Sequence, residues 1–426
     1  MPRLSALISP RLATFLLGAG ALALVVSIIA FPDQAFRSSL QGLHLWWKLV
    51  FPALLPFLIL TELLRGLGLM HGFGVLLEPL FRALLRIPGI GGFVIAVGFT
   101  AGMPAGAAAV SALRSNRQLT REEGERLLAA SHLLSPVILI SVVGVGFLNS
   151  APAGLALAVI HYGTALILAV VHRLRLPAPA DKTYSARPNA GVFRRFFSAW
   201  EEAREQDGRT FGKLLGDAVV SSVQQLFVIG GFMMMFSLIL QAITLTGLVE
   251  AAASFLLAWS DGALSDLLSP ILAASVAGLF EPHLGAYALT RLLAPGTEGG
   301  LPWGIAALSA FLAWGGLSSH AQVRSLTAAT DLRFSRFVLA RLQHGGIAYI
   351  ATLLAWHPLY AYFGRPAAIS AWAPSLAQNH SWLMEQHRWW PFISPMMLQF
   401  GSTLLAMLLL SIFAAFLFHR GRKSSK

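Results

Sequence analysis

The sequence predicts an all-α polytopic membrane protein, built as an inverted repeat with two re-entrant helical hairpins and discontinuous transmembrane helices. Hydrophobic residues make up 56% of the chain and charged residues only 12%, whereas soluble domains carry roughly 25% charged residues. Two apolar stretches are interrupted at their centres by glycine and proline. The order of elements also recurs in the second half of the chain, and the charge pattern places the two halves in opposite orientations.

The composition excludes several classes of protein. A surface so poor in charge does not suit a soluble enzyme, a disordered tail protein or a nucleic-acid binder, and the partner it favours is the lipid bilayer. The net charge of +12 first reports topology in a membrane protein. Cysteine is absent, which excludes disulfides, thiolate metal sites and a cysteine nucleophile. Because the usual metalloprotease, hydrolase and phosphate-loop motifs are also missing, we expect neither an enzyme nor a cofactor.

Eight runs are candidate membrane spans, because a membrane helix needs about 20 mostly apolar residues. They are Leu12–Phe31, Trp46–Leu64, Leu127–Leu148, Ala153–Val171, Val219–Leu245, Trp303–Leu326, Phe337–Tyr362 and Phe392–His419. The first run is too long for the apolar part of a signal peptide. We therefore expect it to remain as an uncleaved span.

Two further apolar stretches, Phe93–Leu113 and Leu267–Leu292, do not fit as simple spans. Glycine and proline interrupt their centres, and helix interiors tolerate both residues badly. Broken backbone survives in a bilayer only where protein or a water-filled cavity covers it. We expect re-entrant hairpins at about 90–114 and 266–292, each entering and leaving on the same side. The alternative is two ordinary spans that are kinked.

The basic residues predict the orientation. Nine of the 31 lysines and arginines lie in the segment His172–Lys213, which should therefore be cytoplasmic. Counting eight spans and two hairpins then places both termini in the cytoplasm. The residues Arg114 to Arg121 and Arg333 fall on the same side. If the hairpins crossed the membrane, Arg114 to Arg121 would lie outside, against the rule.

The same order of elements occurs in Trp46–Val171 and in Val219–Tyr362: span, amphipathic segment, hairpin, interrupted span, span. The amphipathic segments are about His71–Leu85 and Glu250–Trp259. Inverted repeats with helices broken at matching positions are typical of secondary transporters. The broken ends expose amide N–H groups and carbonyls that can hold a solute near the midplane.

Glu281 is the strongest candidate site residue, because a carboxyl group inside an apolar stretch is costly and its default interpretation is functional. It could bind a proton, a cation such as sodium, or a donor on the solute. Alternatively, it reaches the outer interface or pairs with a structural base. A second candidate is a polar run within a span: Ser318, Ser319, His320, Gln322 and Arg324. There the alternatives are bonds between helices and, for Arg324, extension to the interface. If Arg324 faces the cavity, the site suits an anion.

The remaining candidates lie at the predicted breaks. They are Gly102, Met103, Pro104, Gly106, Ser135, Pro136, Pro282, His283 and Gly285. Ser135 either contacts the solute or bonds the backbone that the break frees. His283 either binds solute and senses pH or packs. The glycines and prolines of the first hairpin are expected chiefly to shape it.

Five motifs carry a family resemblance: Phe51–Phe57, Pro88–Phe93, Gly102–Ala107, Glu122–Leu127 and Gly315–Gln322. They resemble the sporulation integral membrane proteins of endospore-forming bacteria, and the similarity covers most of Trp46–Tyr362. Both interrupted halves look like the nucleoside-recognition (Gate) domain, which concentrative nucleoside transporters and the membrane part of ferrous-iron transporters share.

The resemblance divides the chain into five parts. Residues 1–44 hold the first transmembrane helix and a linker, 45–175 a first Gate-like repeat, and 176–213 a basic cytoplasmic loop. Residues 214–362 hold a second, inverted Gate-like repeat, and 363–426 an external loop, the last helix and a basic cytoplasmic tail. A homo-oligomer is expected by analogy only.

What the family implies is export of dipicolinic acid, a small dicarboxylate, from the mother cell across the outer forespore membrane. Glu281 would then carry a coupling proton, since an ionised carboxylate suits an anionic solute poorly. The first alternative is the same architecture moving nucleosides or another polar metabolite. The second is a structural protein of spore-envelope assembly that transports nothing. An intramembrane phosphatase with mirrored halves would need clustered glutamates together with a serine–arginine phosphate loop, and we do not find this combination in the sequence.

Overall fold

A computed structural model of the chain describes residues 10–85, 90–174, 191–258, 262–292 and 302–364. Helices joined by turns and short loops make up this part of the chain, which contains no strand. Among these residues, four helices are long and apolar enough to cross a membrane: Pro32–Gly66, Ala151–Arg173, Phe211–Leu245 and Phe334–Phe363. The prediction of an all-α membrane protein is thus confirmed. The predicted last span, the loop before it and the basic tail lie outside the described residues.

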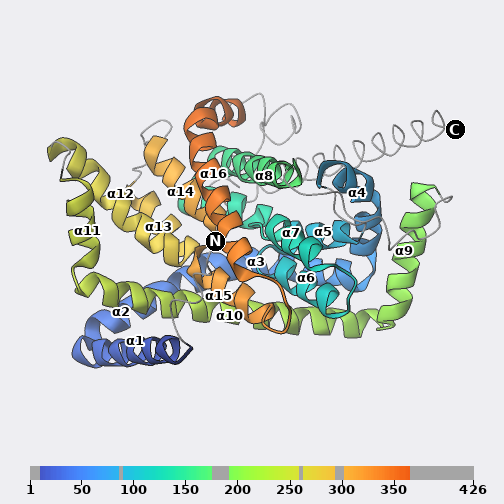
Figure 1. Cartoon of the computed structure of the whole chain (residues 1–426), viewed down its shortest axis with the longest axis horizontal. Helices are drawn as coiled ribbons and strands as arrows, with labels where there is room; N and C mark the ends of the chain where they lie inside the picture. Colours follow the sequence, from blue (N-terminus) through green and yellow to red (C-terminus); the bar gives the residue numbers. More distant parts are fainter. Residues whose placement is uncertain (1–9, 86–89, 175–190, 259–261, 293–301, 365–426) are drawn as a thin grey trace, which may run out of the picture.

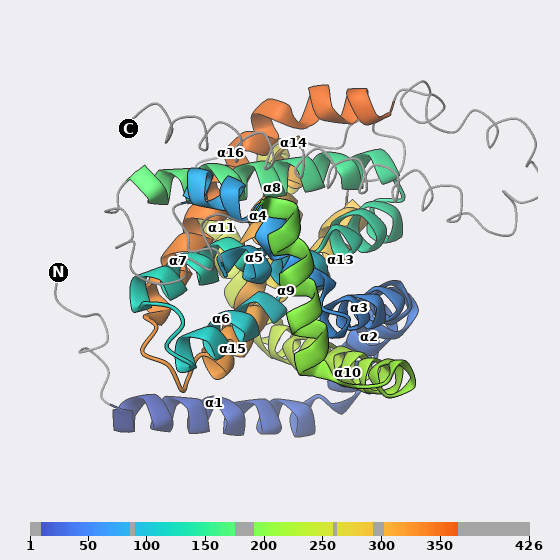
Figure 2. The same ribbon diagram turned by 90° about the vertical axis from the view of Figure 1, so that its right-hand side faces the viewer.

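The first helix, α1 (Pro10–Ala30), lies apart from the main body, and most of its apolar side chains are exposed (Figure 2). A single helical run then continues through α2 (Pro32–Leu45), a π-helical turn and α3 (Phe51–Gly66). The predicted span starting at Trp46 therefore begins 14 residues too late, and the expected linker is helical. Pro32 and Asp33 start this helix, as suits a first turn. Gly42 then lets it pack closely on Met233 and Ser237 of the long helix α10.

The first half of the chain follows the predicted order. Its remaining elements are α4 (Leu69–Leu85), α5 (Gly91–Ala101), α6 (Ala105–Ser115), α7 (Arg121–Ser131), the π-helical η3 (Ile138–Phe147) and α8 (Ala151–Leu174). The helices α5 and α6 pack against each other and form the helix pair expected at 90–114. The interrupted span is α7 followed by η3, with the break at residues 132–135.

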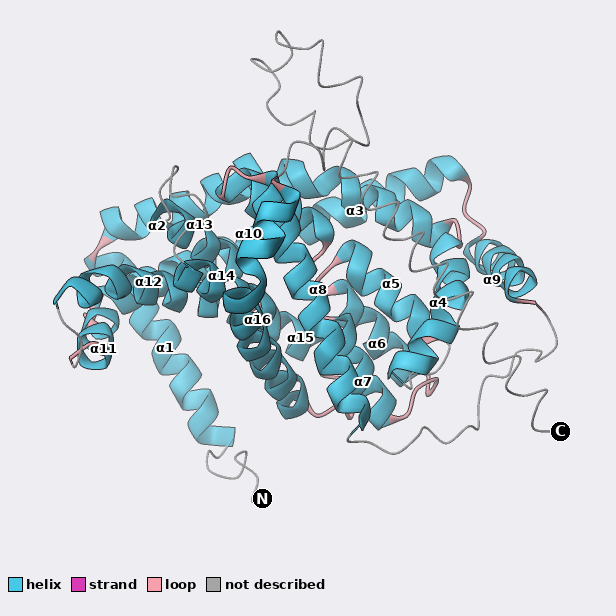
Figure 3. Cartoon of the chain, turned by 90° about the horizontal axis from the view of Figure 1, so that it is seen from above, coloured by secondary structure: helices cyan, strands magenta, loops and turns pink. Residues whose placement is uncertain are grey.

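The second half repeats this order. Its elements are α10 (Phe211–Leu245), α11 (Leu248–Leu256), α12 (Gly262–Phe280), α13 (Pro282–Leu292), α14 (Pro302–Trp314), α15 (Gly316–Leu326) and α16 (Phe334–Phe363). The pair α12–α13 corresponds to α5–α6, and the broken span α14–α15 corresponds to α7–η3. Figure 3 shows α12, α13 and α14 on one side of α16, and α5, α6 and α7 on the other.

Glycine causes two of the breaks. Gly102 ends α5 with φ of +74°, and the consecutive Gly315 and Gly316 separate α14 from α15 with φ of +86° and +76°. Side chains other than glycine rarely adopt this left-handed region. A helix cannot continue through such residues, so the sequence itself fixes where these two helices stop.

The segment between the halves, for which the charge pattern predicts a basic loop, contains the helix α9 (Val192–Asp207). One face of α9 packs on α4 and on the turn before it: the Trp200 indole N–H donates to Leu67 O in the turn over 2.7 Å, and Arg195 pairs with the buried Glu78 of α4. The Phe196 ring fills the space beside Gly72. The segment has an amphipathic pattern over α9, but its nine basic residues also fit a charged loop, so the helix was not predicted.

The two halves place their amphipathic helices at opposite ends of the molecule. Figure 1 shows α9 near the start of α10 and α11 near its end. Because α4 packs against α9, it lies at the end opposite to α11. The interior between these ends is apolar and draws on both halves, with Val50, Leu139 and Leu157 from the first and Leu226 and Leu308 from the second.

Ion pairs join the halves away from the apolar interior. Arg114 forms two bonds to Asp331, of 2.8 and 2.9 Å, and these hold the pKa of Asp331 below its usual value. Arg333 forms two bonds of 2.7 Å to the buried Glu125. Burial opposes ionisation of Glu125, but the bonds from Arg333 outweigh it and lower the pKa of Glu125. Arg114 and Arg333, which the charge pattern places on the same side of the membrane, thus both take part in ion pairs between the two halves.

Candidate functional site

Four helix breaks meet at the centre of the molecule. Gly102 lies against Ser135, since a Cβ atom on this glycine would be 3.3 Å from the Ser135 Cβ. A Cβ atom on Gly315 would lie 3.1 Å from Met103 Sδ and 3.3 Å from His132 Nε2. Gly316 lies against the backbone of Glu281 in the same way. Residues from both broken spans and both helix pairs are therefore brought together at one place.

Glu281 occupies the break between α12 and α13 and is only 3% exposed. Its Oε1 accepts the backbone N–H of His283 over 3.2 Å, so the side chain caps α13 where the helix dipole favours a negative charge. The same oxygen is 2.6 Å from His283 Nδ1, and Oε2 accepts the hydroxyl of Ser318. These three donors compensate the cost of burying a carboxylate. Pro282 takes the first helical position, which suits its fixed φ.

A second polar contact, made by the residue next to Ser318, reaches the first half. His132 Nε2 and Ser319 Oγ lie 3.3 Å apart, and they join the break after α7 to the start of α15. The ring of His320 lies 4.0 Å from that of Trp314, and its Nδ1 bonds Gly316 O over 2.7 Å. Within the described chain, Nδ1 of His132 and Nε2 of both His283 and His320 are buried without a partner. A small polar solute could satisfy such atoms.

The first-half candidates mainly shape the site. Ser135 Oγ accepts the Ile138 N–H over 3.4 Å, so this hydroxyl serves the freed backbone, and Pro136 follows it at the start of the next helix. Pro104 follows Met103 through a cis peptide bond. A Cβ atom on Gly106 would lie 2.7 Å from Ser131 O, so α6 can approach the end of α7 only because this residue is glycine.

Three other candidates lie outside the buried network. Gly285 serves packing, because a Cβ atom there would lie 2.2 Å from the Gly278 Cα. Gln322 is half-buried. Arg324 is exposed, and its guanidinium lies 5.7 Å from the centre of the Phe334 ring. The structure therefore does not support Arg324 as the group that would face an anion in the cavity.

The buried guanidinium at the centre belongs instead to Arg341 of α16, which is 1% exposed. Its Nη1 donates to His132 O over 2.6 Å and its Nη2 to Ala129 O over 2.5 Å. These carbonyls are at the end of α7, where the helix dipole is negative. Arg341 thus stabilises a helix that stops inside the protein.

Two histidines complete this basic region. His344 Nδ1 is 3.3 Å from Arg341 Nη1, and its Nε2 is 3.1 Å from His161 O. His161 Nε2 in turn accepts the Leu134 N–H over 3.3 Å, and so satisfies the broken backbone. Neither Arg341 nor His344 is among the residues predicted for the site, although both are ionisable and lie three residues apart inside a predicted span. The rule applied to Glu281 would have found both of them.

Comparison with known proteins identifies the family. A family model described as nucleoside recognition (Gate) matches residues 47–164, which include the breaks at Gly102 and Ser135. The chain is also 36% identical over 362 residues to the sporulation integral membrane protein YlbJ of Bacillus subtilis (strain 168). This match covers 84% of the chain and 86% of that protein. The chain belongs to this family. The resemblance drawn from the five motifs is therefore confirmed: the chain is an integral membrane protein of a sporulation family with a nucleoside-recognition domain.

Proposed function

We propose that the chain is a secondary transporter that carries a small organic anion through the centre where the four breaks meet. Dipicolinic acid is the first candidate solute, because the family is one of sporulation membrane proteins and the motif resemblance implies this dicarboxylate. The protein would act as a carrier and not as an enzyme. A nucleoside or another polar metabolite is the second candidate, which the description of the matching family model favours.

The observation that carries the proposal is the placement of Glu281. It is a buried carboxylate at a helix break, bonded to Ser318 across a second break. Intramembrane ionisable groups of this kind mark the pathways of solutes and protons. Protonation of Glu281 would turn it from an acceptor into a donor. The same residue could thus couple proton movement to the binding of an anion.

The proposed transport cycle requires two halves of opposite orientation, with α5–α6 and α12–α13 as re-entrant hairpins. The recurrence of the element order supports this arrangement, and so does the position of α4 and α11 at opposite ends of the molecule. Each half would then open the central site to one side of the membrane, as in other carriers built from inverted repeats. Both termini would be cytoplasmic, in agreement with the charge of the segment between the halves.

Counterflow in proteoliposomes tests the proposal. Vesicles with the purified chain, preloaded with unlabelled dipicolinate, should accumulate labelled dipicolinate well above empty vesicles. Glu281→Gln should cut this flux at least tenfold, because an amide nitrogen replaces one of the two oxygens that accept bonds from His283 and Ser318. Accumulation of labelled uridine in place of dipicolinate would move the assignment to the second candidate. Uptake of neither solute above empty vesicles would contradict transport and favour a structural role in spore-envelope assembly.

The proposed location is the mother-cell-derived outer forespore membrane. Deletion of the gene from its sporulating host should then give spores that lack dipicolinate, while the mother cell still makes it. Dipicolinate should be measured separately in purified spores and in mother-cell lysate. Normal dipicolinate in the spores would contradict this placement.

A further inference from the structure

The strongest candidate for a further site is Arg341, whose buried charge has no anionic partner among the described residues. An arginine side chain keeps its charge in proteins, and none of the ion pairs within the described residues includes this one. Its two Nη atoms are bonded to carbonyls, but its Nε is buried without a partner in this part of the chain. A buried cation of this kind favours an anion beside it.

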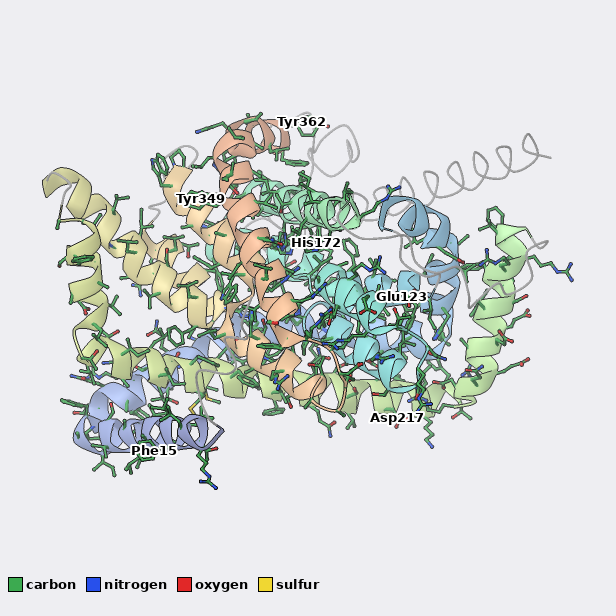
Figure 4. The ribbon with its side chains drawn as sticks, viewed as in Figure 1. Phe15, Glu123, His172, Asp217, Tyr349 and Tyr362 are labelled. Atoms are coloured by element: carbon green, nitrogen blue, oxygen red, sulfur yellow. The ribbon has the colours of Figure 1, made fainter. Side chains whose placement is uncertain are left out.

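A groove leads to this guanidinium. It has a volume of about 300 Å³, lies between α12, α14 and α16, and includes Arg341 in its lining. Phe311, Trp314 and Tyr349 contribute aromatic rings, and Gly346 leaves space at its surface. Figure 4 shows Tyr349 on α16 beside α14. Apart from Arg341, few polar groups reach the groove.

The groove adjoins the central site through Trp314. The indole N–H donates to Leu279 O over 3.0 Å, and Leu279 also lines the groove. Trp314 also contacts the ring of His320, which belongs to the central site. A molecule in the groove would therefore be separated only by the Trp314 side chain from the central site, where Glu281 and Ser318 lie.

We propose that this groove is a binding site for an aromatic carboxylate, whose carboxylate pairs with the charge of Arg341 where this residue lines the groove, while its ring lies against Trp314. The inference rests on the proposed function and names the place where the anionic end of the solute binds. The volume is at the lower limit of small-molecule sites, roughly 300–1,000 Å³. A single ring with carboxylates fits such a space, and a two-chain lipid does not. Charge and aromatic lining together favour this class over a neutral solute.

Binding of labelled dipicolinate to the purified full chain in detergent tests the site. Gly346→Leu should weaken binding at least tenfold, because the new side chain fills the groove. The substitution should not disturb the fold, since a Cβ atom at this position has no other atom within 4 Å. Arg341→Lys should weaken it by at least as much, since lysine lacks the planar guanidinium that can bond the α7 carbonyls and face a carboxylate at the same time. Gly231→Leu is the matched control: this exposed glycine of α10 also has nothing within 4 Å. It should bind like the unchanged chain.

Three results would overturn the proposal. The first is full binding by Gly346→Leu with unchanged thermal stability, which would leave the transport proposal standing and place the solute elsewhere. The second is a complete lack of dipicolinate binding and flux in the unchanged chain, in which case the proposed function fails together with the site. The third is displacement by laurate at concentrations at which benzoate has no effect, which would make the groove a site for lipid chains.

Discussion

At the residue scale, the site depends on a few buried polar side chains that are costly to bury. Glu281 could be predicted because it is a carboxyl group inside an apolar stretch. Arg341 was equally visible in principle, but Arg324 drew attention because it follows a run of other polar residues. The sequence shows which residues are ionisable. It does not show which side of a helix faces the centre of the molecule. Neighbours such as His132 and Ser319, 187 residues apart, become evident only once the chain is folded.

Ser318→Ala should lower both stability and flux, because it leaves one oxygen of Glu281 without its hydroxyl donor. Loss of a hydrogen bond to a buried charged group costs about 2 kcal/mol. Thermal unfolding in detergent and dipicolinate counterflow would measure the two effects. Ser325→Ala on the same helix is the control, because Ser325 is exposed. Equal unfolding temperatures for the two variants would contradict the role assigned to Ser318.

At the scale of elements, the pattern of breaks was predictable and the helices between the repeats were not. Glycine and proline mark the ends of α5 and α12, since these residues limit the backbone directly. The helical run from Pro32 and the helix α9 were missed because both are rich in polar residues. Each is stabilised by packing on a distant partner, α10 or α4, which local sequence does not reveal.

Gly285→Ala should destabilise the α12–α13 pair. The added methyl group would lie 2.2 Å from the Gly278 Cα, so the two helices would have to move apart. Overpacking of this kind costs about 2 kcal/mol. Gly231→Ala is the matched control in an exposed, open position of α10, and it should be neutral or stabilise the helix by up to about 1 kcal/mol. Thermal unfolding of both variants measures this, and a stable Gly285→Ala would contradict the close packing.

The contact between α7 and the start of α16 should depend on pH. Arg333 lowers the pKa of Glu125 in the folded chain, so the pair stabilises the fold above the ordinary carboxyl pKa. This contribution is lost as the pH falls through the lowered value. At pH 7, Glu125→Gln should therefore lower the free energy of unfolding by about 2 kcal/mol. The variant should unfold at a lower temperature than the unchanged chain.

Below about pH 4 the difference between Glu125→Gln and the unchanged chain should shrink, because Glu125 itself becomes protonated. Unfolding temperatures of both proteins between pH 7 and pH 3 would show the convergence. A constant difference across this range would mean that the ionised carboxylate of Glu125 contributes nothing.

At the scale of the whole molecule, the two halves share one centre. Figure 1 shows α4 to α7 on one side of α16 and α11 to α13 on the other, with α10 running past both groups. The polar contacts of Glu281 with Ser318 and of Ser319 with His132 lie where the breaks meet. The order of elements in both halves could be predicted from the sequence, and the inverted repeat stays a prediction. It could not predict that a basic group from α16 would stabilise the broken end of α7.

Thiol cross-linking of the breaks is the most direct test of this arrangement, and the chain contains no cysteine of its own. Met103 Sδ and Ser319 Oγ lie 3.1 and 3.0 Å from the same point, a Cβ atom on Gly315. The double variant Met103→Cys and Ser319→Cys should therefore be joined by a short bifunctional thiol reagent in native membranes. The product is detected by cutting the chain between the halves at an inserted protease site. The pair Ser38→Cys and Gln241→Cys, whose side chains are 3.2 Å apart, is the positive control. Joined fragments in both variants are the predicted result, and joined fragments in the control alone would contradict the shared centre.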